Sequence, residues 1–184
     1  MPRSSRGVVL FFLAGLAGCG PGGGPDEALP GPRVGSGNPG APDPVVTPAT
    51  APEVLAAVRG GGGRATLVNV WATWCRPCLE ELPDILEVRG RLRDRGMEVI
   101  LVSGDFPGES AAVVGFLREQ GVDFPSFIRA GDDMEFIDGL SPEWSGALPA
   151  SFLYGADGRQ VEFWEGKITA AELERKVVRV LESS

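Results

Sequence analysis

Two cysteines that follow an apolar run constrain the fold of this chain more than any other feature. Residues 66–71 are apolar and rich in β-branched side chains, which predicts a buried strand. Cys75 and Cys78 come soon after this run, and the residues beyond Cys75 predict a helix that reaches about residue 94. A Cys-x-x-Cys pair at a strand-to-helix junction is the expected context of a redox-active dithiol.

Strand-like and helix-like segments alternate along the rest of the chain. We expect helices over residues 52–59, 110–120 and 132–140, strands over 97–103 and 123–129, a hairpin of strands 150–154 and 160–164, and a last helix capped by Thr169. The hairpin signal is the strongest, because Gly-Ala-Asp-Gly separates its two strands. This order predicts an α/β fold with a central mixed β-sheet and helices on both faces.

The charge and the absence of histidine exclude several function classes. The net charge is −8 and the body of the chain has no basic block, which argues against a nucleic-acid partner. Without histidine there is no Ser-His or Cys-His hydrolase site and no His-ligated metal. We therefore expect no metal and no cofactor.

The position of Cys75 favours a reactive thiolate. The amino end of a helix carries a partial positive charge, and its free N–H groups can bond a sulfur atom. Arg76 adds a full positive charge beside it, and Pro77 suits the first turn because it lacks an N–H. The pKa of Cys75 should therefore lie well below that of a free cysteine. Cys78, one turn further, can close a disulfide with it.

Two other interpretations of the cysteine pair are weaker. A structural disulfide that encloses only two residues gives little entropic stabilisation, because the closed loop is so short. A zinc site would need two further ligands, and the chain has neither a second cysteine pair nor a histidine. Dithiol–disulfide exchange is the chemistry that remains.

The amino-terminal segment has the features of an export signal. A short basic stretch precedes residues 7–18, which are uncharged and too few to span a bilayer as a helix. They end in Leu-Ala-Gly before Cys19, which resembles a bacterial lipobox. We therefore expect residues 1–18 to be a lipoprotein signal peptide and Cys19 to carry the lipid that anchors the protein to a membrane.

A Gly- and Pro-rich stretch separates Cys19 from the predicted fold. Residues 20–50 contain eight Gly and eight Pro, and they cannot bury enough apolar surface to offset the entropy of ordering. The expected organisation is thus a signal peptide over residues 1–18, a lipidated cysteine with a disordered tether over 19–50, and one folded domain over 51–184.

Two segments resemble a known family. Residues 68–83, Val-Asn-Val-Trp-Ala-Thr-Trp-Cys-Arg-Pro-Cys-Leu-Glu-Glu-Leu-Pro, are similar to the active-site region of TlpA/ResA-type thiol–disulfide oxidoreductases. Residues 146–158, Gly-Ala-Leu-Pro-Ala-Ser-Phe-Leu-Tyr-Gly-Ala-Asp-Gly, resemble the cis-proline segment of that family and the hairpin after it. The resemblance covers about residues 51–182 and implies a thioredoxin-like fold.

The resemblance also implies roles for individual residues. Cys75 would attack the substrate and Cys78 would resolve the mixed disulfide. Pro149 would be a cis-proline that faces them, and Trp74 would flank and cover the site. Glu81 matches an acidic residue that the family keeps near the cysteines and could move the proton of Cys78. An exposed helical glutamate is the alternative interpretation for Glu81.

One departure concerns the strand before the cysteines. Cytoplasmic thioredoxins have a buried aspartate where this chain has Asn69, and asparagine cannot exchange a proton. The membrane-side relatives usually have asparagine there, so proton transfer would pass to Glu81 or to water.

The function implied is reduction of disulfides in exported proteins, with apocytochromes among the candidate substrates. The implied partners are these protein disulfides and a membrane thiol electron donor, and a monomer is expected. The location implied is the periplasmic face of a bacterial membrane, with the outer membrane favoured because Gly20 rather than Asp follows Cys19. The alternatives are a thiol peroxidase of the peroxiredoxin type and a non-enzymatic metallochaperone of the same fold.

Overall fold

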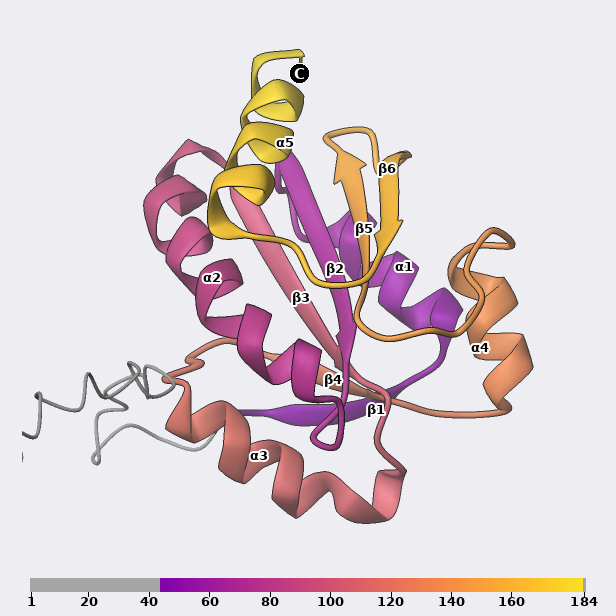
Figure 1. Ribbon diagram of the computed structural model, residues 1–184. Coiled ribbons are helices and arrows are strands. Elements are labelled where there is room, and N and C mark those ends of the chain that lie inside the picture. The colour runs from indigo at the N-terminus through magenta and orange to yellow at the C-terminus, as the bar shows by residue number, and fades with distance from the viewer. Residues whose placement is uncertain (1–43, 184) are drawn as a thin grey trace, which may run out of the picture. The chain divides into compact units, whose positions relative to one another are not determined.

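Six strands form one mixed sheet in the part of the chain that the computed structural model describes, residues 44–183 (Figure 1). Their order across the sheet is β1-β4-β3-β2-β5-β6. The first four of these run parallel to one another, whereas β5 is antiparallel to β2 and to β6. The strands are β1 (Val46–Ala49), β2 (Ala65–Trp71), β3 (Met97–Ser103), β4 (Ser126–Arg129), β5 (Ala150–Gly155) and β6 (Gln160–Glu165).

Helices cover both faces of this sheet. Their bounds are α1 (Ala51–Gly60), α2 (Arg76–Leu92), α3 (Ser110–Glu119), α4 (Asp133–Leu140) and α5 (Ala170–Ser183), with short 3₁₀ turns at Arg93–Arg95 and Pro107–Glu109. One hydrophobic cluster joins α2, α3 and α5 to the sheet, and a second joins α1 and α4 to the opposite face. The predicted α/β class, with a mixed sheet between two layers of helices, is therefore confirmed.

The central strand β2 supplies both clusters because its side chains alternate between the two faces. Leu67 and Trp71 pack on the side of α2, whereas Val68 and Val70 pack on the side of α1. Asn69 falls in the first set by this alternation, so a polar side chain is built into the face that carries the cysteine helix. All seven residues of β2 are buried.

The folded domain begins earlier than the sequence predicts. Strand β1 lies inside the segment that we assigned to the disordered tether, and it pairs in parallel with β4. The Ser126 N–H donates to Val45 O and the Ala130 N–H to Ala49 O, both at 2.9 Å. An edge strand needs hydrogen bonds on one side only, so it tolerates Pro48. The boundary at residue 51 is therefore wrong for residues 46–49.

The signal peptide, Cys19 and most of the tether lie outside the described residues. Within the described part, no helix combines the length and the apolar character needed to cross a membrane. The remaining expected elements are present, and the β5–β6 hairpin closes through Gly155–Gly158, where the Gly155 N–H donates to Arg159 O at 2.9 Å.

Candidate active site

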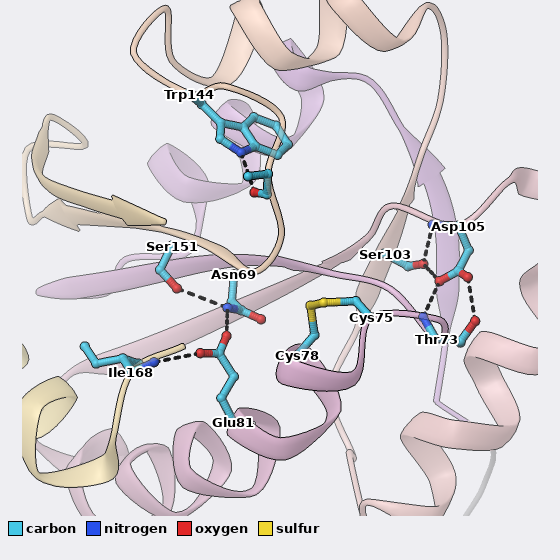
Figure 2. The surroundings of a disulfide bond; sticks show 11 residues. Asn69, Thr73, Cys75, Cys78, Glu81, Ser103, Asp105, Trp144, Ser151 and Ile168 are labelled. Atoms are coloured by element: carbon cyan, nitrogen blue, oxygen red, sulfur yellow. Dashed lines mark hydrogen bonds between the residues drawn. A yellow bond between two sulfur atoms is a disulfide. The ribbon is translucent and has the colours of Figure 1, made fainter. Parts of the chain in front are cut away.

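The two cysteines lie at the amino end of α2, where β2 has just ended. Cys75 is the N-cap residue with an extended backbone, and the Leu79 N–H donates to its carbonyl at 3.1 Å. Cys75 and Cys78 form a disulfide with their Cα atoms 5.3 Å apart (Figure 2). Cys75 retains 6% of its surface and Cys78 none, so Cys75 is the one that a substrate can reach.

The guanidinium group of Arg76 forms an ion pair with the nearby carboxylate of Glu80. Its guanidinium lies 3.1 Å from Glu80, and Lys167 from the loop before α5 lies 3.0 Å from the same carboxylate. These two bonds lower the pKa of Glu80, with the Lys167 bond the larger cause. Because the Arg76 side chain is 90% exposed, solvent screens its charge.

The segment opposite the cysteines contains the one cis peptide bond of the described chain, Leu148–Pro149. This is the geometry that the resemblance implied for Pro149. The register of β5 against β2 pairs Ala150 with Val70, so Pro149 lies at the end of β2 from which the cysteine loop departs. The indole N–H of Trp144 donates to Ala147 O at 2.9 Å (Figure 2). This bond anchors the main chain just before the cis Leu148–Pro149 bond.

Trp74 is mostly exposed, with 66% of its surface accessible. It lines a cavity of about 290 Å³ together with Phe106, Leu148 and Trp144. Phe106 is also exposed, at 64%. Trp74 and Phe106 thus lie at the rim of a hollow beside Leu148, next to the cis-proline, and the covering of the cysteines by Trp74 stays a prediction.

Glu81 is fully buried one turn beyond Cys78, on the inner face of α2. Its Oε1 accepts a hydrogen bond from Asn69 Nδ2 at 2.8 Å, and its Oε2 accepts one from the Ile168 N–H at 3.0 Å (Figure 2). Burial raises the pKa of Glu81 to about 7, although the two donors and the charge of Lys167 oppose the rise. The exposed-glutamate interpretation is wrong, because this carboxyl group has no solvent contact.

Asp105 supports the loop that carries the cysteines from a neighbouring segment, and sequence analysis missed it. This buried carboxylate accepts hydrogen bonds from the Thr73 N–H at 2.9 Å, from Thr73 Oγ1 at 2.6 Å and from Ser103 Oγ at 2.5 Å. The contacts tie the end of β3 to the residues just before Cys75 (Figure 2). The only signal was an aspartate after a predicted buried strand, which also describes many ordinary turns.

No cluster of His, Cys, Asp and Glu in residues 44–183 is arranged to hold a metal ion. The chemistry available at this site is that of the cysteine pair and its buried carboxyl neighbour. A mixed sheet with a Cys-x-x-Cys pair at a helix amino end and a cis-proline opposite defines the class of thioredoxin-like dithiol–disulfide proteins.

The chain belongs to the AhpC/TSA family, whose model matches residues 48–161. It is similar to the thiol–disulfide oxidoreductase ResA of Bacillus thuringiensis strain Al Hakam, with 34% identity over 112 residues, or 61% of each chain. ResA of Bacillus subtilis strain 168 is 32% identical over 110 residues, 58% of this chain and 56% of that protein. The matched region is thus less than two thirds of these curated relatives.

Solved structures agree with the fold. A thiol:disulfide interchange protein of the thioredoxin family from Chlorobium tepidum TLS is 27% identical and has a TM-score of 0.57, covering 68% of this chain and 83% of its own. A DsbF homologue from Corynebacterium diphtheriae has a TM-score of 0.55 at 21% identity, covering 68% of this chain and 75% of its own. The thioredoxin-like fold that the resemblance implied is confirmed.

Proposed function

We propose that the protein is an extracytoplasmic thiol–disulfide oxidoreductase that reduces disulfides of exported proteins through Cys75 and Cys78. The observation that carries this function is the placement of the pair. One sulfur is accessible at a helix amino end, its partner is buried, and a carboxyl group with a pKa of about 7 lies one turn further on. The similarity to ResA over 112 residues supports the same chemistry.

The reaction begins with the reduced pair. The Cys75 thiolate attacks a substrate disulfide, a mixed disulfide forms, and the first substrate sulfur leaves as a thiolate that takes a proton from solvent. Cys78 then gives its proton to the Glu81 carboxylate and attacks Cys75 Sγ. The Cys75–Cys78 disulfide forms, and the second substrate sulfur leaves as a thiolate and is protonated. Two electrons have passed to the substrate, and a dithiol donor must return them.

Glu81 suits the role of proton acceptor in the second step. A general base works best when its pKa lies near the operating pH, because it is then ionised often enough and still basic enough. Burial supplies this condition at Glu81, whose pKa of about 7 stands well above the ordinary 4.5. Asn69 cannot exchange a proton, so the buried carboxyl group takes the place of the aspartate found in cytoplasmic thioredoxins.

The substrate would bind along the cis-proline segment. An extended peptide would add to the backbone of Leu148 as an extra strand, which gives affinity without demanding one sequence. The adjacent cavity, rimmed by Trp74 and Phe106, would take an apolar side chain near the target cysteine. Unfolded or partly folded exported proteins, apocytochromes among them, offer such segments.

The location rests on residues outside the described range. The lipobox-like sequence before Cys19 supports a lipid anchor on the periplasmic face, with the outer membrane favoured, and the Gly- and Pro-rich tether would hold the domain off the lipid. The electron donor would then be a membrane thiol protein, and the oxidoreductase itself a monomer. Incorporation of radiolabelled palmitate into the wild type and its loss in Cys19→Ser would test the anchor.

Reduction of insulin disulfides with dithiothreitol tests the activity. We expect the wild-type chain to accelerate insulin precipitation well above the rate with dithiothreitol alone, and Cys75→Ser to return it to that background. Cys19→Ser is the matched control, since it removes the third thiol of the chain and leaves the pair intact. An active Cys75→Ser variant would show that the proposed chemistry is wrong.

A further inference from the structure

Asn69 contains a buried acceptor that has no hydrogen-bond partner. Its Nδ2 donates to Glu81 Oε1 at 2.8 Å and to Ser151 Oγ at 3.0 Å, whereas within the described residues its Oδ1 bonds to nothing. The Asn69 side chain has no exposed surface. An unpaired buried acceptor is unfavourable and uncommon in folded proteins, so this oxygen calls for an explanation.

The direction in which Asn69 Oδ1 points supplies an explanation. In Figure 2 the Asn69 carboxamide lies with Nδ2 toward Glu81 and Ser151 and with Oδ1 on the side of the Cys75–Cys78 disulfide. The sulfur atoms of a disulfide carry no hydrogen, so in this oxidised form they have nothing to donate. Within residues 44–183, Asn69 Oδ1 therefore lacks a partner in the oxidised state, in which Cys78 has no S–H to donate.

Reduction of the disulfide creates a new hydrogen-bond donor inside the protein. Two electrons from a dithiol donor break the sulfur–sulfur bond, and the donor becomes a disulfide. Cys78 Sγ takes up one proton, Cys75 Sγ is left as a thiolate, and the second proton of the donor goes to solvent. Cys78 and Asn69 both have no exposed surface, so the new S–H must find its acceptor inside the protein. The free Oδ1 is an amide acceptor of the right kind.

We propose that Asn69 is a positioning residue that joins the two groups of the proton transfer: its Nδ2 holds Glu81, and its Oδ1 accepts the S–H that Cys78 gains on reduction. This inference rests on the proposed function, because it assigns a role in the same dithiol–disulfide cycle. It gives the asparagine that replaces the thioredoxin aspartate a task that needs no exchangeable proton.

A measurable consequence follows for the redox equilibrium. The bond from Nδ2 to Glu81 is available in both redox states, so its contribution largely cancels. The bond from Cys78 to Oδ1 exists only in the reduced state and stabilises the dithiol. Removing Oδ1 should shift the equilibrium with glutathione toward the disulfide by about tenfold, which is about 30 mV toward more negative potential for this two-electron couple.

The test compares two substitutions on the same strand. Asn69→Leu keeps the shape of the side chain and removes both polar atoms. Thr66→Val is the control, because it makes an equally conservative polar-to-apolar change at a buried β2 position on the opposite face of the sheet. The full chain is equilibrated in glutathione buffers at about pH 8, and the dithiol fraction is read by thiol alkylation and mass spectrometry.

We expect Asn69→Leu to show the shift of about tenfold and Thr66→Val to match the wild type. An unchanged equilibrium in Asn69→Leu would overturn the role of Oδ1 while leaving the proposed function standing. A wild-type pair that does not exchange with glutathione at all would instead overturn the proposed function, and this inference with it.

An infrared measurement tests the bond even if Asn69→Leu fails to fold. The Cys78 S–H stretching band is isolated by subtracting the spectrum of Cys75→Ser/Cys78→Ser from that of Cys75→Ser. We expect this band at lower wavenumber than that of a free thiol, because the S–H donates a hydrogen bond. It should stay there when Glu81→Gln is added. A free-thiol band, or a band that moves back with Glu81→Gln, would contradict Oδ1 as the acceptor.

Discussion

Replacing Glu81 with glutamine should remove a large pH-dependent loss of stability from the oxidised protein. The folded-state pKa of this group is about 7, raised from the ordinary 4.5 by burial. The folded protein therefore binds more protons than the unfolded chain between these two pH values. The stability contributed by protonated Glu81 is fully present below about pH 4.5 and is lost as pH rises through about 7.

The size of the effect follows from the same two values. The step from 4.5 to about 7 corresponds to a loss of about 3 kcal/mol of unfolding free energy in the wild type above neutral pH. Glutamine resembles the protonated acid, because each of them has one group that carries hydrogen. In either case that N–H or O–H must face one of the two donors that contact Glu81, Asn69 Nδ2 or the Ile168 N–H. The two proteins should therefore be similar in stability at low pH and diverge as pH rises.

Urea unfolding of the oxidised chains between about pH 4 and pH 9 measures this difference. We expect the difference in unfolding free energy, Glu81→Gln minus wild type, to increase by about 3 kcal/mol from the low to the high end of this pH range. Glu80→Gln is the control, because the pKa of the exposed Glu80 is lowered by Lys167 and Arg76, and any effect of that change should have the opposite sign. A difference between Glu81→Gln and wild type that stays constant with pH would refute the raised pKa.

Three further substitutions test other parts of the site. Cys78→Ser should accumulate a mixed disulfide between Cys75 and substrate, visible on a non-reducing gel, because the resolving thiol is gone. Asp105→Asn should lower the unfolding free energy by about 2 kcal/mol in urea, since its amide group cannot accept all the donated bonds. Lys167→Gln should move the midpoint of the pH dependence of mixed-disulfide resolution upward, because that ammonium group lowers the pKa of Glu81. Unchanged gels, urea midpoints or pH profiles, respectively, would contradict these expectations.

The sequence predicted the reactive pair well because its signals are local. A buried strand, a Cys-x-x-Cys motif and a helix follow one another within about thirty residues, and each has a strong pattern of its own. The cis geometry at Pro149 came from the family resemblance, because nothing in the surrounding composition distinguishes a cis from a trans proline.

The environment of Glu81 could not be predicted in the same way. Its position on α2 looks like one of several charged residues on a helix, and its burial depends on the loop before α5, which is 87 residues away at Ile168. Asp105 presents the same difficulty, since its partner Thr73 lies 32 residues earlier. Such contacts are fixed by the packing of distant segments, and a single sequence carries no record of them.

Strand β1 was missed for a different reason. Its four residues include a proline and follow a stretch dominated by Gly and Pro, so composition alone favours an unstructured segment. Pairing with β4 on one side overrides that local preference.

The bond between Ile168 and Glu81 has a consequence for how this site can vary. The donor is a main-chain N–H, so every residue except proline can supply it. We therefore expect substitutions at position 168 to act through the packing of this buried side chain and not through the acid–base chemistry. An Ile168→Pro substitution would be the one exchange there that deletes the donor, and the carboxyl group would then titrate at a still higher pH.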